Sequence, residues 1–296
     1  MTTTTRHPVV AGVDGSVWAL DAVRWAAREA TRRDASLHLF HVCVLPPLGP
    51  HVAAGTELRI TEALVEQGYG WLREAKAAAR DAAGEVEIRT QLRVGAAAGA
   101  LIAESAQAMM LVLGSHGLGG FAGMLVGSVA RGVAAHGRCP VVVVRGDQPP
   151  ADGPVVVGVD SSTVCDAAIA FAFDEASLRG VPLVAVHTWL DESVGETWSV
   201  LPFDIDWDVV AAEERRLLAA KLTGWQEKYP GVEVRQEVVR GRPVPGLLAW
   251  AGGAQLIVVG ARGRGALTGV GLGSTSQNLL HHSTCPVAVV HPGNGG

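Results

Sequence analysis

Residues 9–14 read Val-Val-Ala-Gly-Val-Asp and residues 155–160 read Val-Val-Val-Gly-Val-Asp, at an offset of 146 positions. The same offset carries other short motifs of the first half onto the second, namely Gly95 onto Gly241, Gly114 onto Gly260, Gly127-Ser128 onto Gly273-Ser274, and Cys139-Pro140-Val141 onto Cys285-Pro286-Val287. A single offset that holds along the whole chain indicates duplication with almost no net insertion. The sequence therefore predicts two copies of one domain in tandem.

The length and composition fit two globular domains. The chain has 296 residues, of which 48% are hydrophobic and 18% are charged, so each half can bury a core. The formal net charge of -5 gives no electrostatic reason to bind nucleic acid or an anionic membrane. Residues 1–7 lack the apolar segment of a signal peptide, and no apolar run reaches the roughly 18 residues of a membrane span. We therefore expect a cytoplasmic protein.

The cysteines give no sign of a metal or redox site. Cys43, Cys139, Cys165 and Cys285 show no C-x-x-C spacing, which disfavours a zinc site or a thioredoxin-type motif. We expect small buried side chains rather than reactive thiols.

Within each half, short apolar runs typical of buried strands alternate with amphipathic stretches typical of helices. The first half is expected to run strand 9–13, helix 19–32, strand 37–44, helix 57–82, strand 86–94, helix 97–108, strand 109–113, helix 127–136, strand 141–144. Because parallel strands need crossover connections, this order predicts an α/β fold with a mostly parallel sheet and helices on both faces. The predicted domains are a flexible N-terminus 1–7, domain 8–146, linker 147–153, domain 154–291 and a flexible C-terminus 292–296.

A glycine-rich segment follows the fourth expected strand of each half. It reads G-x-x-G-x9-G-S, from Gly114 to Ser128 and again from Gly260 to Ser274. Glycine lets the backbone turn tightly and approach a ligand, and the unpaired N–H groups at a helix start attract phosphate. The alternative is a tight connection with a serine that caps the helix. Because the spacing occurs twice, we interpret both copies as phosphate-binding loops, although neither carries the lysine of a Walker loop.

An aspartate ends the first expected strand of each half, Asp14 in one and Asp160 in the other. Ligands of open α/β sheets bind at the carboxyl ends of strands, where the winding direction reverses. The carboxylate can accept hydrogen bonds from ribose hydroxyls or contact Mg²⁺, and it can equally cap the following helix. His41 and His187 end the second strands, and we interpret them as strand-end residues rather than ligands.

These residues resemble the universal stress protein family in its tandem, ATP-binding form, from about Pro8 to Val144 and from Pro154 to Val290. The resemblance rests on the motif G-x-x-G-x9-G-[S/T], the aspartate after strand one, and the Cys-Pro-Val strand that ends each domain. It implies two doubly wound, five-stranded parallel sheets of the Rossmann-like, adenine nucleotide alpha hydrolase-like type, with strand order 3-2-1-4-5. That order places the winding reversal between strands one and four.

The resemblance also implies which residues would hold ATP. In the first half they are Gly12, Val13, Asp14 and Val42 for the adenosine, and Gly114, His116, Gly117, Gly127, Ser128 and Val129 for the phosphates. In the second half the corresponding residues are Gly158, Val159, Asp160, Thr188, Gly260, Arg262, Gly263, Gly273, Ser274 and Thr275. The candidate contacts of Mg²⁺ are Asp14 and Asp160. No residue is assigned a catalytic role.

The leading hypothesis is an ATP-binding regulatory protein of the stress response, in which bound nucleotide shifts conformation or assembly. The loops carry no evident general base or carboxylate pair, so we expect slow hydrolysis at most. Two alternatives stay open: an enzyme that adenylates a substrate or hydrolyses ATP on this fold, and a dimeric scaffold without nucleotide.

Two apolar surfaces point to assembly. Strand five is apolar in both halves, at Val141–Val144 and Val287–Val290, and an apolar sheet edge needs cover. The resemblance implies that the strand-five edges of the two domains pair within the chain, and the alternative is cover by the termini. We also expect a homodimer with these edges paired, and regulatory proteins as further partners. The stretch 118–126 is also apolar for a loop, which suggests a lid or a contact surface.

Overall fold

The computed structural model describes residues 7–47, 54–118, 126–145, 150–160, 162, 165–189, 206–263 and 271–292. The chain divides into two compact units, Met1–Arg145 and Gly146–Gly296. The ends expected to be flexible lie almost wholly outside the described residues, and so does most of the apolar stretch 118–126.

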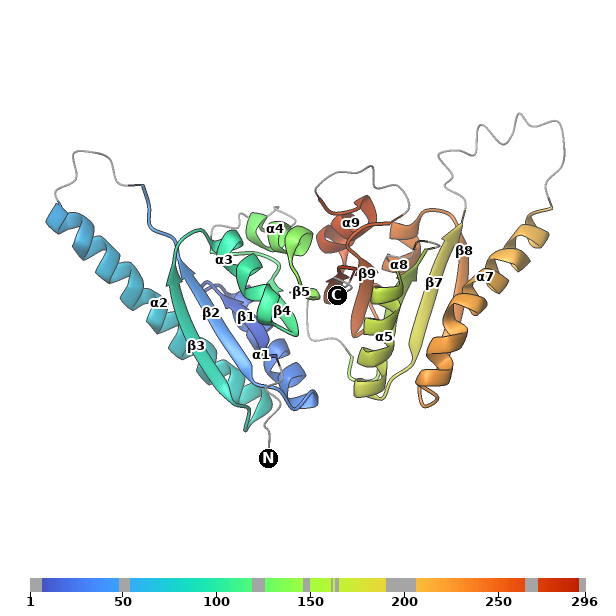
Figure 1. Ribbon diagram of the computed structural model, residues 1–296, viewed down its shortest axis with the longest axis horizontal. Helices are drawn as coiled ribbons and strands as arrows, with labels where there is room; N and C mark the ends of the chain where they lie inside the picture. Colours follow the sequence, from blue (N-terminus) through green and yellow to red (C-terminus); the bar gives the residue numbers. More distant parts are fainter. Residues whose placement is uncertain are drawn as a thin grey trace. The chain divides into compact units, whose positions relative to one another are not determined.

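Strands and helices alternate along the described part of the first unit, as the sequence predicts (Figure 1). Its elements are β1 (Val9–Val13), α1 (Val17–Arg32), β2 (Leu37–Cys43), α2 (Ala54–Ala83), β3 (Ile88–Val94), α3 (Ala97–Glu104), the 3-10 turn Ser105–Gln107, β4 (Met110–Gly114), α4 (Ser128–His136) and β5 (Val141–Val144). The largest difference concerns the helix expected over 97–108. It ends at Glu104, where the Ser105 hydroxyl donates to the carbonyl of Ile102 at 2.6 Å and the chain tightens into the 3-10 turn.

The first unit forms a parallel sheet in which β1 is the central strand. Its strand order is β3-β2-β1-β4-β5, as the family resemblance implies. Val9 pairs with Leu37 of β2 on one side and with Met110 of β4 on the other. The chain winds outward from β1 to β3 and then continues on the other side of β1. The winding therefore reverses between β1 and β4, where ligands of open α/β sheets bind.

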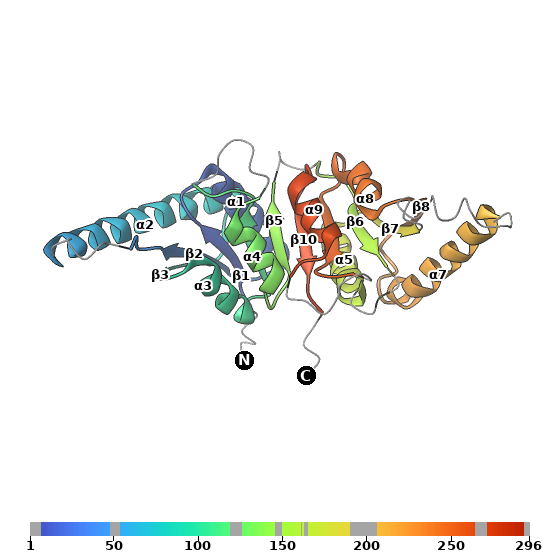
Figure 2. The same cartoon turned by 90° about the horizontal axis from the view of Figure 1, so that it is seen from above.

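Helices cover both faces of this sheet. Figure 2 shows α1 and α2 on one face of the first unit and α3 and α4 on the other. Because β1 is covered on both faces, all its residues are buried, and it is apolar throughout rather than alternating. The buried face of α1 consists largely of alanines, which let the helix pack closely on the sheet.

The second unit repeats the alternation and the sheet. Its elements are β6 (Val155–Val159), α5 (Cys165–Arg179), β7 (Leu183–Trp189), α7 (Trp207–Lys228), β8 (Val234–Arg240), α8 (Pro243–Ala251), β9 (Leu256–Gly260), α9 (Ser274–His282) and β10 (Val287–Val290). The strands are parallel in the order β8-β7-β6-β9-β10. Between α5 and α7, Phe173 stacks on Trp225 with a centroid distance of 6.2 Å.

Each unit buries one glutamate of its first helix against an arginine. Glu29 accepts from Nε of Arg33 at 2.7 Å, and Glu175 accepts from Nη2 of Arg179 at 2.7 Å. Both glutamates have no exposed surface. A buried carboxylate needs such a partner because its desolvation is costly. The first pair joins α1 to its C-cap residue Arg33, the second lies within α5, and each supplies the partner that a buried carboxylate requires.

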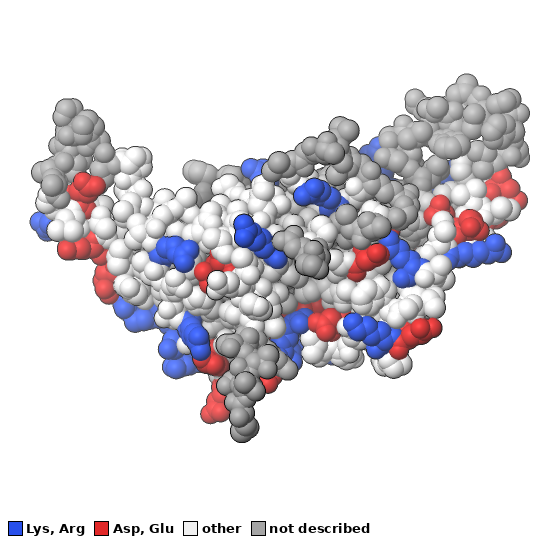
Figure 3. Space-filling view, viewed as in Figure 1, with Lys and Arg blue, Asp and Glu red and all other residues white. Residues whose placement is uncertain are grey.

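Most other charged side chains lie at the surface. On the face shown in Figure 3, acidic and basic side chains of the described residues are interspersed and form no extended patch of one sign. Within the described part of the chain, every helix is too short or too polar to cross a membrane.

Candidate functional site

Asp14 lies in the turn that connects β1 to α1. Its Oδ1 accepts hydrogen bonds from the N–H of Ser16 at 3.0 Å and from the Ser16 hydroxyl at 2.7 Å. Ser16 is the N-cap of α1, and its Oγ accepts from the N–H of Ala19 at 3.1 Å. Asp14 therefore positions the capping residue instead of capping the helix itself.

Two glycines bring the chain after β4 against the start of α1. A Cβ at Gly114 would lie 2.6 Å from the carbonyl carbon of Trp18 and 2.9 Å from the backbone nitrogen of Ala19, so a larger residue would clash with the helix backbone. A Cβ at Gly117 would lie 2.7 Å from Oδ2 of Asp14. The glycines thus allow the bend 114–117 to lie directly beside the Asp14 carboxylate.

Gly127 and Ser128 begin α4 next to this bend. The N–H of Gly127 donates to the carbonyl of Ser115 at 2.8 Å. Gly127 is the N-cap of α4 and supplies no side-chain hydrogen bond, so the first helical N–H groups lack a side-chain cap. Ser128 is the first residue of the helix and not its cap. The alternative of a serine-capped connection is therefore wrong for α4.

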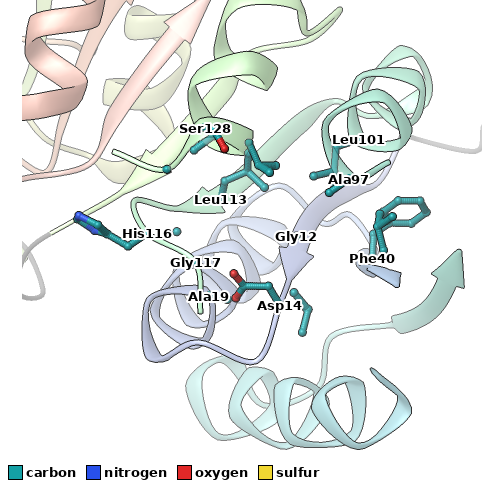
Figure 4. Close-up of a pocket in the computed structure, with 16 residues that line it drawn as sticks. Gly12, Asp14, Ala19, Phe40, Ala97, Leu101, Leu113, His116, Gly117 and Ser128 are labelled. Atoms are coloured by element: carbon teal, nitrogen blue, oxygen red, sulfur yellow. The ribbon is translucent and has the colours of Figure 1, made fainter. Parts of the chain in front are cut away.

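The ends of these elements surround a cavity of about 300 Å³ in the first unit, which is within the range of small-molecule pockets. Figure 4 shows Phe40, Ala97 and Leu101 on one side of it and Asp14 and Gly117 on the other, with Ser128 at the start of α4. The cavity thus has an apolar end and a polar end. It is lined by Gly12, Val13, Asp14, Ala19, Phe40, Val42, Ala97, Leu101, Leu113, Gly114, His116, Gly117, Gly127, Ser128, Val129 and Ala130.

The residues assigned to the first site from the sequence all line this cavity. They are Gly12, Val13, Asp14, Val42, Gly114, His116, Gly117, Gly127, Ser128 and Val129. Their role in holding a nucleotide stays a prediction. The lining residues that were not foreseen are Ala19, Phe40, Ala97, Leu101, Leu113 and Ala130. Two spacings could have indicated some of them, since Phe40 lies two residues from Val42 on one face of β2, and Ala97 and Leu101 are four residues apart on α3.

The second unit repeats the relation between aspartate and glycine bend. Oδ1 of Asp160 accepts from the N–H of Ser162 at 2.9 Å, and a Cβ at Gly263 would lie 2.8 Å from Oδ2 of Asp160. The N–H of Gly273 donates to the carbonyl of Ala261 at 2.8 Å, and Gly273 caps α9 without a side-chain hydrogen bond. The other residues assigned to this site lie at the ends of β6, β7 and β9, in the bend, and at the start of α9: Gly158, Val159, Thr188, Gly260, Arg262, Ser274 and Thr275.

Lys221 of α7 supports the second site and was not foreseen. Its Nζ donates to the carbonyl of Asp160 at 2.9 Å and to that of Ser162 at 2.6 Å, and it lies 3.3 Å from Oδ1 of Asp166. The turn after β6 is therefore fixed by a cation that is already paired with a carboxylate. The position at the same repeat offset in the first half is Ala75, and this difference was the available signal.

The two histidines at the ends of the second strands are buried and bind the neighbouring strand. Nδ1–H of His41 donates to the carbonyl of Val13 at 2.7 Å, and Nδ1–H of His187 donates to that of Val159 at 2.9 Å. Nε2 of His187 also lies 2.8 Å from a carboxylate oxygen of Glu214. His41 does not line the first cavity.

His116 occupies the outer edge of the first cavity. Its ring lies 5.2 Å from the ring of Trp18, and its Nδ1 is 2.9 Å from the hydroxyl of Ser115. In Figure 4 the imidazole points away from the middle of the cavity. His116 therefore borders the opening rather than filling it.

All four cysteines are buried and free, as expected. Burial raises the pKa of Cys139 to about 12 and that of Cys165 to about 11. It also raises the pKa of Cys43 and Cys285. A thiol with a raised pKa carries little thiolate at neutral pH, so these side chains behave as small hydrophobic residues.

A doubly wound parallel sheet with helices on both faces defines the class of Rossmann-like α/β domains, and here a glycine bend, a helix start and one carboxylate lie at its winding reversal. Two such units follow one another in this chain. The chain belongs to the universal stress protein family, whose family model matches residues 5–145 and 153–291.

Similar proteins cover nearly the whole chain. It is 40% identical over 298 residues to a universal stress protein of Mycolicibacterium smegmatis, covering 97% of this chain and 98% of that protein. It is 36% identical over 292 residues to a universal stress protein of Mycobacterium tuberculosis, covering 95% of each. The crystal structure of a universal stress protein from Archaeoglobus fulgidus has a TM-score of 0.69 at 20% identity, covering 97% of this chain and 99% of that one. This last similarity supports the fold.

Proposed function

We propose that each unit binds an adenine nucleotide, with ATP as the ligand, and that the nucleotide regulates the protein in a stress response. The observation that carries the proposal is the first cavity, where the glycine bend, the start of α4 and Asp14 converge on one volume of about 300 Å³. The residues that converge there come from separate parts of the chain. Their meeting is more informative than any one motif.

The apolar end of the cavity suits a purine base. Phe40, Val42 and Leu101 line it, and their side chains are at most 8% exposed. A flat heteroaromatic ring gains from contact with such side chains because both leave water. The sugar would then lie over Gly12. Any other residue at this position of β1 would place a side chain in the space beside Leu113.

The polar end suits a phosphate chain. The uncapped N–H groups at the start of α4 and the positive end of the helix dipole attract an anion. No lysine or arginine is among the described residues that line the cavity. Backbone amides would therefore supply most of the phosphate contacts, as in other glycine-rich anion sites.

Asp14 needs a donor or a cation between its carboxylate and a bound phosphate, because like charges repel at short range. Its Oδ2, beside Gly117, can accept from a ribose hydroxyl. The same oxygen can also hold Mg²⁺, which is often bound by one carboxylate together with substrate phosphates and water. Asp160 has the equivalent place in the second unit. When bound there, Mg²⁺ would neutralise phosphate charge.

The cavity offers few groups for phosphoryl transfer. Asp14 and His116 are the titratable side chains among the described lining residues. Hydrolysis depends on a positioned base and on charge stabilisation in the transition state. The proposal therefore includes slow hydrolysis at most, and a turnover well above ~1 s⁻¹ would favour the enzyme alternative. A homodimer, regulatory partner proteins and a cytoplasmic location complete the proposal.

The test is a measurement of bound nucleotide followed by titration. Protein purified without added nucleotide is denatured, and the released small molecules are identified by mass spectrometry. Nucleotide-free protein is then titrated by calorimetry with ATP, and with GTP as the matched control. We expect an adenine nucleotide in the first experiment and a preference for ATP in the second. If no adenine nucleotide binds at about 1 mM, which corresponds to about 4 kcal/mol of binding free energy, the proposal is wrong and the scaffold alternative is favoured.

A further inference from the structure

The backbone conformation at the glycine bend is the same in the two units. The N-caps Gly127 and Gly273 have the same φ of -63° and ψ values of 147° and 153°. Both donate a backbone hydrogen bond of 2.8 Å to the bend. A Cβ added at Gly117 would lie 2.7 Å from Oδ2 of Asp14, and one added at Gly263 would lie 2.8 Å from Oδ2 of Asp160. Differences between the two sites therefore come from side chains that the same backbone presents.

The helix that follows the bend carries more hydroxyl groups in the second unit. The first turn of α4 reads Ser128-Val129-Ala130, and all three residues line the first cavity. The first turn of α9 reads Ser274-Thr275-Ser276. Ser276 is buried, and its hydroxyl donates to the carbonyl of Gly260 at 2.6 Å, which fixes the helix start to the end of β9. Ser274 and Thr275 remain as hydroxyl-bearing residues at the start of α9.

Two arginines of the second unit replace a histidine and an alanine of the first. Arg262 replaces His116, a lining residue, and Arg242 replaces Ala96, the N-cap of α3. Arg242 is likewise the N-cap of α8. Both arginines are exposed. Lys221 is paired with Asp166 and with backbone carbonyls, so the cation that takes the place of a lining residue at the phosphate end is Arg262.

The end of the site that would hold the base has less aromatic surface in the second unit than in the first. Phe40 and Val42 of the first unit correspond to Val186 and Thr188 of the second, which lack the aromatic ring and add a hydroxyl. The methyl group of Thr188 packs near α8, where a Cβ on Gly246 would lie 3.1 Å from it. The second unit thus offers less aromatic surface to a base and more donors to a phosphate chain.

We propose that the two sites select nucleotides by phosphate number. The second site takes its affinity from the phosphate chain and prefers the triphosphate, whereas the first takes its affinity from the nucleoside and accepts AMP or adenosine almost as well. The inference deepens the proposed function and rests on it. One protein would then sense the nucleoside pool at one site and the triphosphate at the other.

The expected preference for phosphate number follows from the hydrogen-bond donors at each of the two sites. A hydrogen bond between a charged donor and a phosphate oxygen is strong enough to change affinity by about tenfold or more. We therefore expect the second site to lose at least about tenfold in affinity from ATP to ADP, and again from ADP to AMP. The first site should change by less than about threefold per phosphate.

The experiment isolates each site and exchanges the residues that differ. Gly117→Ala weakens the first site and Gly263→Ala weakens the second, and each variant is titrated with adenosine, AMP, ADP and ATP so that the tighter, unaltered site is resolved first. In the second site, R262H combined with T275V should remove most of the phosphate preference. In the first site, H116R combined with V129T should introduce it. Each introduced residue is native at the equivalent position of the other unit, which limits the risk of misfolding.

Circular dichroism and the thermal midpoint confirm that the variants are folded. If a glycine variant fails to fold, two-site fits of the exchanged variants in the otherwise unchanged chain give the same comparison. Equal phosphate dependence at both sites, or exchanges that leave it unaltered, overturns this inference while nucleotide binding stands. If neither site binds any of the four ligands, the proposed function itself fails. Increasing salt should weaken ATP binding more at the second site, because exposed cations are screened.

Discussion

Gly117 and Asp14 are so close that a methyl group on the glycine would lie 2.7 Å from Oδ2 of the carboxylate, and Gly263 and Asp160 repeat this relation at 2.8 Å. The contact joins the bend after the fourth strand to the end of the first strand, where the winding reverses. Because it recurs in both units, the contact is a property of the repeated domain. It also limits the space beside the aspartate carboxylate.

Replacing either glycine should therefore impair one site. We expect Gly117→Ala or Gly263→Ala to lower the ATP affinity of its own site by about tenfold or more, measured by calorimetry. The added methyl pushes the bend or the carboxylate out of position. Gly99→Ala in α3 is the control, because nothing lies within 4 Å of its Cβ and alanine is the better helix residue by up to about 1 kcal/mol. Unchanged affinity in both single variants and in the double variant would show that the bend does not hold the nucleotide.

Asp14→Asn separates the two roles open to this carboxylate. The amide keeps an oxygen that can accept from Ser16 but loses the negative charge. If Asp14 holds Mg²⁺, the variant should bind Mg²⁺-ATP at least about tenfold more weakly and bind metal-free ATP no worse than the wild type. Calorimetry with Mg²⁺ and with a chelator gives both values. An equal loss under the two conditions would instead indicate a contact with the ribose.

Loss of the ion pair between Arg179 and Glu175 should strongly lower the stability of the second unit. Their side chains are 3% and 0% exposed, so Arg179→Leu leaves a buried carboxylate without its main partner. We expect the free energy of unfolding to fall by about 3 to 5 kcal/mol in urea titrations. Adding Glu175→Leu should recover much of the loss. Arg216→Ala, which removes an exposed pair with Glu213, should change stability by less than about 1 kcal/mol.

His38 should make the first unit less stable in mild acid. Burial lowers the pKa of His38 below its usual 6.5, and the attraction of Glu104 opposes this only in part. As the pH falls through about 6.5, the unfolded chain takes up the proton before the folded one, so protonation favours unfolding. The contribution of His38 is therefore present above about pH 6.5 and is lost as the pH falls toward its folded pKa.

The His38→Gln variant should show a flatter loss of stability between about pH 7 and 5, measured as the urea midpoint at each pH. The exposed His7, changed to glutamine, serves as the control for replacing a histidine at the surface. A variant whose profile matches the wild type over this range would show that another group causes the acid sensitivity.

The cysteines should resist alkylation in the folded protein. Burial raises the pKa of Cys139 to about 12, so its thiolate fraction at neutral pH is very small. Iodoacetamide at about pH 8 should modify the native chain slowly and the urea-unfolded chain at all four positions within the same time. Mass spectrometry of tryptic peptides identifies the sites. Rapid native labelling of Cys165, at the start of α5, would indicate that the second site opens readily.

Patterns among residues close together in the sequence predicted those parts of the structure that depend on neighbouring residues. The tandem repeat, the strands and most helices follow from apolar periodicity, and the glycine bends follow from glycines at fixed spacing. Asp14 and Gly117 were assigned to one site although they are 103 positions apart in the sequence, because the doubly wound order brings the first and fourth strands together. The helix over 97–108 was predicted too long because the Ser105 hydroxyl competes for a backbone carbonyl there.

The repeat, the fold class and the residues that line the polar end of the first cavity could be predicted from local patterns alone, since these depend on backbone geometry that glycine and aspartate signal locally. The apolar side chains that complete the cavity, and the contact of Lys221 with the turn at Asp160, became visible only in the folded chain. Leucine, alanine and phenylalanine show the same apolar periodicity in the sequence whether they fill a core or line a pocket. Their role depends on what packs opposite them, and that is set by contacts between elements far apart in the chain.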